Sequence, residues 1–166
     1  KIIIGFYRDL TDRQQWEKKL TESELRYKTL FNSVKEGIII TEVGSLNILL
    51  VNETICSWFE YTSAEIIEKT IEILINNDRD VLDKLENLVS LGENYIQNIF
   101  CKTKSDKVLY IDIRSSPIQM DGKNYTALYL TNVTERYEQQ LRLEKINQEL
   151  ITQDEKYKKL NEELQK

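Results

Sequence analysis

The sequence predicts an α+β domain: a five-stranded antiparallel sheet with short helices on one face, flanked by N- and C-terminal coiled-coil helices. In the central region, two strand-like runs precede several short helical segments and three longer strand-like runs. This order is typical of α+β domains. On both sides of it, charged segments carry apolar residues at alternating spacings of three and four, which indicates coiled-coil helices.

The central elements follow from local signals. The runs Gly37 to Val43 and Leu46 to Val51 read as a hairpin. Asn52 is placed to cap a short helix, and Thr62 with Glu65 forms a capping box for a second one. The remaining elements are expected as a helix around residues 81–88 and strands at residues 95–103, 108–118 and 124–132.

A repeated motif marks both ends of this domain. Asp9-Leu10-Thr11-Asp12-Arg13 and Asn132-Val133-Thr134-Glu135-Arg136 each follow a strand-like run and open a charged helical segment, and Thr11 with Gln14 forms a capping box. Repeats at such a distance are typical of serial domains. We therefore expect a piece of a longer protein, with residues 1–8 a lone buried strand. Its predicted parts are residues 1–10 as the end of an upstream module, 11–33 as a linking helix, 34–134 as the domain and 135–166 as a C-terminal coiled coil.

Both flanking helices carry a seam at heptad spacing. The N-terminal seam comprises Arg13, Trp16, Leu20, Ser23, Tyr27, Leu30 and Val34. The C-terminal seam comprises Leu143, Ile146, Leu150, Tyr157, Leu160 and Leu164, with Gln153 in the remaining position. A narrow stripe flanked by Glu and Lys suits a coiled coil better than a helix packed on its own domain, which stays the alternative. We expect a parallel homodimer through both helices.

Composition excludes several classes of partner and site. The 166 residues carry a net charge of −5 with both signs interspersed, so nucleic acid is not an expected partner. No apolar run is long enough to cross a membrane. We therefore expect a cytoplasmic segment, and a membrane anchor elsewhere in the parent protein stays an open alternative. Histidine is absent, which excludes histidine-ligated haem and a Ser-His-Asp triad, and no metal site is predicted.

The two cysteines are single and form no CxxC pair. Cys56 and Cys101 both lie in apolar stretches, which is typical of small buried side chains in a reducing compartment. A thiol oxidoreductase that uses this pair stays open as the catalytic alternative.

Several segments, taken in order, resemble the PAS domain, a sensory module found in series in bacterial and archaeal signalling proteins. The matching segments are Glu24 to Tyr27 with Leu30 to Ser33, Glu36 to Thr41, Leu50 to Asn52, Trp58 to Thr62 with Glu65 to Ile67, Ser115 to Ile118 with Asp121-Gly122, and Asn132 to Arg136. The resemblance implies a non-catalytic sensory or relay module. It would pass a conformational signal through the flanking helices to adjacent domains, a histidine kinase being the expected output. A passive dimerisation spacer is the alternative.

Departures from the family pattern fall at the expected relay junction of Asn132, Thr134, Glu135 and Arg136 and at two turns. Asn132 replaces the usual Asp and keeps only hydrogen-bonding capacity, while Thr134 is expected to cap the last helix. Glu60 and Glu68 stand where the family often has glycine. A left-handed backbone at Glu60 would cost about 1 kcal/mol or more.

Family members hold haem, flavin, small metabolites or nothing between the sheet and the helices. Strand alternation and helix position predict the following lining: Ile39, Thr41, Ile55, Ile71, Leu74, Ile99, Cys101, Ile111, Ile113, Ser115, Leu128 and Leu130. Because this set is almost wholly apolar, we predict a core filled by side chains and no cofactor, with a small apolar ligand as the alternative. A photoactive flavin is not expected, since Ile71 takes the place of the reactive cysteine of the light-sensing relatives.

Overall fold

The structure is a computed structural model that describes residues 2–75, 78–90 and 95–164, with side chains described for residues 13–75, 78–89 and 95–161. Its elements in chain order are α1 (Ile2–Ser33), β1 (Gly37–Glu42), β2 (Ile48–Val51), α2 (Glu53–Phe59), α3 (Ser63–Ile66), the 3-10 turn η1 (Ile71–Ile73), α4 (Arg79–Ser90), β3 (Tyr95–Lys102), β4 (Val108–Met120), β5 (Lys123–Asn132) and α5 (Thr134–Leu164). The α+β class is confirmed.

The five strands form one antiparallel sheet in the order β2-β1-β5-β4-β3. The first and last strands of the domain therefore lie side by side at its centre, with Ile39 of β1 opposite Leu128 of β5. On the other side of β5, Asp112 of β4 lies opposite Thr131. This pairing brings the start of the domain next to the strand that leads into α5.

The short helices α2, α3, η1 and α4 cover one face of the sheet and supply half of the core. Alternate residues of each strand point to this face, as the two-residue period of a strand requires. Ile39, Ile111 and Leu128 from the strands meet Phe59 and Leu85 from the helices, and each is fully buried. Burying a large apolar side chain contributes about 1.5–3 kcal/mol, so this shared layer is the main stabilising term.

Local signals position the short helices as predicted. The Asn52 side chain caps α2 by accepting a hydrogen bond from the Ile55 N–H at 3.3 Å. The Glu65 carboxylate accepts from the Thr62 N–H at 2.9 Å, which completes the predicted capping box. Glu60 ends α2 in the left-handed conformation (φ 62°), and Glu68 also has a positive φ of 65°. Both therefore adopt the backbone conformation that favours glycine.

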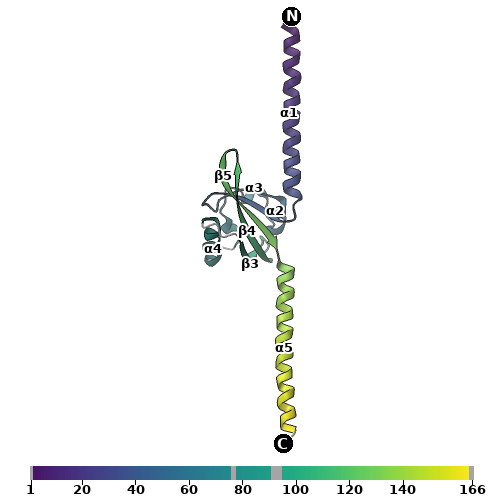
Figure 1. Cartoon of the computed structure of the whole chain (residues 1–166), viewed down its shortest axis with the longest axis vertical. Helices are drawn as coiled ribbons and strands as arrows, with labels where there is room; N and C mark the ends of the chain where they lie inside the picture. Colours follow the sequence, from purple (N-terminus) through teal and green to yellow (C-terminus); the bar gives the residue numbers. More distant parts are fainter. Residues whose placement is uncertain (1, 76–77, 91–94, 165–166) are drawn as a thin grey trace.

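The two long helices extend in opposite directions from the same side of the domain (Figure 1). Within the described residues no helix is both long and apolar enough to cross a membrane. Side chains of the predicted seams are exposed in this single chain: Trp16 is 71% exposed, Leu20 62%, Leu143 65% and Leu150 56%. Both rods thus present apolar stripes to their surroundings.

The N-terminal segment differs from the prediction. The strand predicted at residues 1–8 is wrong for the described part, because residues 2–8 belong to α1, and Thr11 lies inside the helix rather than at its start. A strand needs a neighbour for its N–H and C=O groups, and the described strands all pair within one sheet. A helix satisfies these groups internally. The assignment of residues 1–10 to an upstream module stays a prediction.

Candidate functional site

The residues predicted to line a pocket lie together on the core face of the sheet and its helices. Ten of them belong to one buried apolar cluster: Ile39, Ile55, Ile71, Leu74, Ile99, Cys101, Ile111, Ile113, Leu128 and Leu130. Thr41 is fully buried and Ser115 is half-buried. The sequence reasoning missed part of the same cluster, chiefly Phe59 and Ile66 from the helical side. The sequence did contain a sign of these two core residues, because each belongs to a pair of adjacent apolar residues, Trp58-Phe59 and Ile66-Ile67.

One buried polar group in this core stands out. Among the described side chains, the Thr41 hydroxyl is fully buried and finds no hydrogen-bond partner. Such a group costs about 1–3 kcal/mol relative to a paired one. Ser115, the second hydroxyl of the predicted lining, donates a hydrogen bond to the Leu88 carbonyl at 3.4 Å. Among the described side chains, the predicted lining therefore holds one unsatisfied hydroxyl and one paired hydroxyl, and its other members are apolar.

The two cysteines are both unpaired thiols. Burial raises the pKa of the Cys101 thiol to about 12, and burial is also the largest cause of the raised pKa of Cys56. Thiol chemistry needs the thiolate, which a raised pKa disfavours at neutral pH. Among the described residues, moreover, no cluster of cysteine and carboxylate side chains is arranged to hold a metal ion.

The N-terminal junction, where α1 meets the domain, is organised by Asn52. This side chain is fully buried and makes four hydrogen bonds. Its oxygen accepts from the Ile38 N–H at 3.0 Å and caps α2, while its nitrogen donates to the carbonyls of Phe31 at 3.3 Å and Glu36 at 2.9 Å. One amide thus joins the end of α1, the start of β1 and the start of α2.

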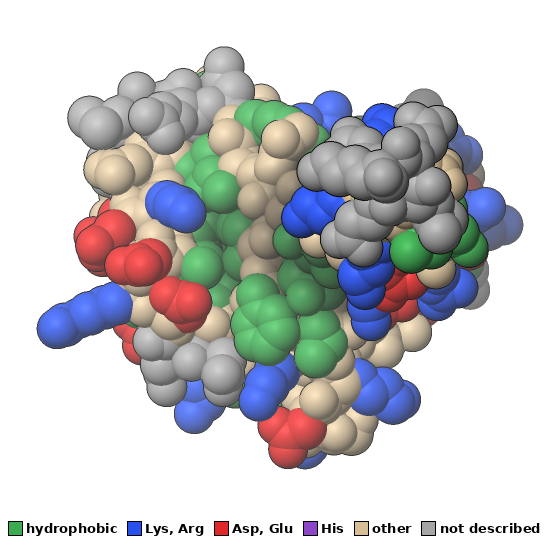
Figure 2. Space-filling view, turned by 90° about the horizontal axis from the view of Figure 1, so that it is seen from below, with side chains coloured by type: hydrophobic (Ala, Val, Ile, Leu, Met, Phe, Trp, Pro, Cys, Tyr) green, Lys and Arg blue, Asp and Glu red, His purple; other side chains and the backbone are tan. Residues whose placement is uncertain are grey.

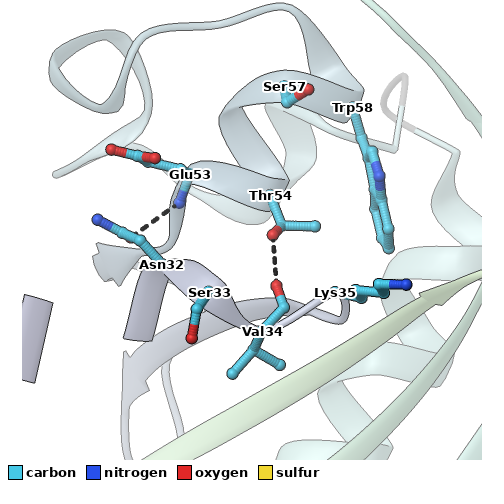
Figure 3. A pocket seen from close by; sticks show the side chains of 8 residues that line it. All are labelled: Asn32, Ser33, Val34, Lys35, Glu53, Thr54, Ser57 and Trp58. Atoms are coloured by element: carbon cyan, nitrogen blue, oxygen red, sulfur yellow. Dashed lines mark hydrogen bonds between the residues drawn. The ribbon is translucent and has the colours of Figure 1, made fainter. Parts of the chain in front are cut away.

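A surface hollow of about 500 Å³ lies beside this junction (Figure 3). Its walls are the last turn of α1 with the following residues, and one side of α2. Two hydrogen bonds cross its floor: the Glu53 N–H donates to the Asn32 side-chain oxygen at 3.1 Å, and the Thr54 hydroxyl donates to the Val34 carbonyl at 2.7 Å. These bonds fasten α2 to the last turn of α1 and to the residue that follows it, so the hollow belongs to a structural joint.

The C-terminal junction contains the predicted relay residues. Thr134 is the first residue of α5 rather than its preceding cap, and its hydroxyl oxygen accepts a hydrogen bond from the Tyr110 N–H of β4 at 2.9 Å. The Asn132 side-chain oxygen accepts from the Thr134 hydroxyl at 2.7 Å and from the Thr134 N–H at 3.0 Å. Asn132 therefore uses its hydrogen-bonding capacity to hold the first residue of α5. Glu135 is exposed and lies in the first turn.

Arg136 is fastened to a carboxylate that the sequence reasoning missed. Asp112 of β4 is 4% exposed and accepts hydrogen bonds from Arg136 at 3.1 Å, the Tyr95 hydroxyl at 2.8 Å and the Asn98 N–H at 2.8 Å. A buried carboxylate is stable when it is paired and hydrogen-bonded in this way. The sequence offered one sign of this buried carboxylate: Asp112 is an acidic residue within the apolar run Tyr110-Ile111-Asp112-Ile113.

Aromatic contacts complete this junction. The Tyr110 ring lies 4.2 Å from the Tyr137 ring of α5 and 6.0 Å from the Phe100 ring of β3, measured between centroids. Seen from below, hydrophobic side chains gather between α5 and the acidic left side of the domain (Figure 2). The first turns of α5 are thus held to β4 by packing as well as by hydrogen bonds.

A third set of polar contacts ties the turn between β3 and β4 to the helices. The Lys107 ammonium contacts the Glu60 carboxylate at 2.6 Å, and the Lys104 ammonium contacts that of Glu65 at 2.6 Å. Hydrogen bonds from these lysines are the largest cause that lowers the pKa of each carboxyl to about 2. The same turn donates the Ser105 N–H to Glu60 at 3.1 Å.

The predicted seam of α5 is exposed wherever its side chains are described. The side chains of Leu143, Ile146, Leu150, Tyr157 and Leu160 are all exposed, whereas Leu164 lies outside the residues whose side chains are described. Leu141 and Ile151 add exposed apolar surface away from the heptad positions. The seam is available for a partner helix, which the prediction of a homodimer requires.

Comparison with known proteins supports the fold and assigns a family model. The family model described as PAS domain matches residues 35–135. None of the curated protein sequences compared with the chain matches it. The PAS domain of an HTR-like protein from Haloarcula marismortui is similar, with a TM-score of 0.61, 16% identity, and coverage of 72% of this chain and 98% of that one.

Two further solved structures are similar at comparable identity. An RNA-binding light-oxygen-voltage receptor gives a TM-score of 0.62 at 15% identity, covering 79% of this chain but 38% of that one. A PAS domain from a two-component sensor histidine kinase gives a TM-score of 0.50 at 12% identity, covering 68% and 98%. At these identities the likeness is one of fold.

Proposed function

The chain belongs to the PAS domain family, and from this premise we propose that it acts as a non-catalytic relay that passes conformational changes in its sheet to α5 and onward to a downstream output domain. PAS domains are sensory modules typical of signal-transduction proteins. The observation that carries the relay is the C-terminal junction, where β4 holds α5 through Tyr110 and Asp112. A displacement of this strand would move the helix with it.

The relay needs a rigid connection between strand and helix. Only Val133 separates β5 from α5, and it is 5% exposed. Thr134 and Arg136 are then anchored on β4, one strand further along the sheet. Because the first turn of α5 is bound to two adjacent strands, a change in their twist or spacing would reach the helix as a tilt or rotation. Relay further requires two arrangements of similar energy.

We propose that the functional unit is a parallel homodimer joined through α1 and α5. The exposed seam side chains of both helices support it, because large apolar side chains at heptad spacing are stabilised by knobs-into-holes contacts with a second helix. Both helices leave the same side of the domain, so a single two-fold axis along the rods would serve both seams (Figure 1). In this arrangement the polar Gln153 would help to fix the register.

We extend the proposal to the surroundings of the chain. The output domain is a histidine kinase and the segment is cytoplasmic, with adjacent domains of the same chain as its partners. The structural similarity to the PAS domain of a two-component sensor histidine kinase supports the fold on which this assignment rests.

We also propose that the core works without a cofactor. Its lining is apolar apart from Thr41 and Ser115, and side chains from α2, η1 and α4 occupy the space against the sheet. Native mass spectrometry with an absorbance spectrum of the purified protein tests this proposal. The expected result is the mass of the protein alone and no absorbance beyond that of the aromatic residues. A bound species of fixed mass would replace it with a ligand-dependent sensor.

A mild substitution in the core distinguishes a relay from a passive spacer. Ile113→Val removes one methylene from the core side of β4, where Ile113 is 1% exposed. If the relay operates, Ile113→Val changes the rate of amide hydrogen exchange at residues 134–140 by more than the rate at residues 79–90 of α4. Unchanged exchange at residues 134–140 would favour a spacer that only dimerises.

A further inference from the structure

The Glu36 side chain connects the two ends of the domain. Glu36 lies between the end of α1 and the first residue of β1. One of its carboxylate oxygens accepts hydrogen bonds from the Arg114 guanidinium at 2.8 Å and from the Thr131 hydroxyl at 3.4 Å. These partners lie 78 and 95 positions further along the chain. A residue at the start of the domain therefore binds the two strands that hold α5.

Each end of this connection is anchored. On the N-terminal side, the Glu36 carbonyl accepts from the Asn52 side chain, which also donates to the Phe31 carbonyl of α1. On the C-terminal side, Thr131 lies opposite Asp112 in the β4-β5 ladder, and Asp112 binds Arg136 of α5. These contacts, together with the pairing of Thr131 and Asp112 in the sheet, connect the last turn of α1 to the first turn of α5.

This connection lies outside the apolar core cluster, although Asn52 and Asp112 are themselves buried. Residues two apart on a strand share a face, so Arg114 lies on the same face of β4 as Asp112, whereas Ile113 between them points into the apolar core. The Glu36 and Arg114 side chains are 38% and 55% exposed. A change in α1 thus has a direct route to α5 across the outer face of the sheet.

We propose that Glu36 is a positioning residue that couples α1 to α5 through Arg114 and Thr131, so that a signal arriving along α1 reaches α5 without a change in the core. The inference rests on the relay role proposed above and names α1 as the element through which a signal enters the relay. Coupling between two elements is a free energy that double-mutant cycles measure. Because the ion pair is exposed, the coupling is modest and is screened by salt.

The test perturbs α1 and reads out α5 by amide hydrogen exchange of the whole chain. Asn32→Ala removes the side chain that accepts from the Glu53 N–H and loosens the end of α1. We expect it to change exchange at residues 134–140 by about two- to five-fold, the range open to an exposed ion pair. In a Glu36→Gln background the same substitution should leave exchange there unchanged.

A charge exchange separates coupling from a merely structural effect. Glu36→Arg combined with Arg114→Glu reverses the pair and should restore the response of residues 134–140 to Asn32→Ala. Arg114→Gln alone should abolish that response, as Glu36→Gln does. An equal response with and without Glu36 would overturn the Glu36 route while leaving the relay in place. No response of α5 in any background would overturn both the route and α1 as its input.

Discussion

The Thr134 hydroxyl accepts a hydrogen bond from the Tyr110 N–H at 2.9 Å, so the first residue of the C-terminal helix is fastened to β4, the strand next to the one that leads into it. The hydroxyl in turn donates to the Asn132 side chain at 2.7 Å. The family pattern usually has Asp where this chain has Asn132. An amide oxygen makes the same contact without a charge beside the helix, and the junction depends on hydrogen bonds and on the Asp112–Arg136 ion pair.

Loss of the buried Asp112 carboxylate should destabilise the domain. Asp112→Ala leaves the Asn98 N–H and the Arg136 guanidinium without their acceptor, at a cost of about 1–3 kcal/mol in the free energy of unfolding. Urea unfolding followed by circular dichroism measures this cost. Asp154→Ala, which breaks the exposed Asp154–Lys158 pair, is the matched control and should change stability by less than about 0.5 kcal/mol. Equal effects would contradict the structural role of Asp112.

The unpaired Thr41 hydroxyl offers a test of the core. Thr41→Val replaces it with a methyl group of similar size and should stabilise the domain by about 1–2 kcal/mol, because no buried polar group is then left unsatisfied. Thermal unfolding of the two proteins measures the difference. Destabilisation by this substitution would show that the hydroxyl has a partner in solution, such as a bound molecule in the core.

The turn between β3 and β4 should weaken at low pH. Hydrogen bonds from the lysines lower the pKa values of Glu60 and Glu65 to about 2 in the folded chain, from the ordinary value of 4.5. Their contribution to stability is therefore present in full above about pH 4.5 and is lost as the pH falls toward 2. The double variant Glu60→Gln with Glu65→Gln should lose less stability than the wild type between pH 5 and pH 3, followed by urea unfolding. Identical losses would show that these carboxylates do not titrate as described.

The α5 seam should control self-association. Leu150→Asp places a charge on the exposed seam and should shift the protein toward monomer in sedimentation velocity, since a buried charge has no partner there. Ile151→Asp is the control, because Ile151 is 60% exposed but lies outside the heptad positions. If both substitutions act alike, or neither acts, the seam is wrongly assigned.

Strand periodicity made most of the sheet readable from the sequence. The strand predicted at residues 108–118 is observed as Val108–Met120, and its apolar residues Ile111 and Ile113, two positions apart, both belong to the core. The strand predicted at residues 1–8 failed because apolar residues such as Ile2 to Ile4 suit a helix or a strand. The choice between the two depends on neighbours that a local pattern does not reveal.

The junction contacts were beyond sequence reasoning for a different reason. Asp112 binds Arg136, 24 positions away, and Glu36 binds Thr131, 95 positions away, so the pairing depends on strand order and register. A motif such as Asn132 to Arg136 marks the place of the junction. It does not show which side chains across the sheet receive its hydrogen bonds.

The relay from sheet to helix is tested most directly by the distance between the two α5 helices. A nitroxide on Gln148→Cys in a Cys56→Ser background, with Cys101 left in place because it is buried, gives one exposed label in each chain. Pulsed electron paramagnetic resonance should show a defined distance between labels, and Thr134→Val, which releases the Tyr110 N–H, should shift it or add a second peak. No distance between labels, or one that Thr134→Val leaves unchanged, would contradict the account.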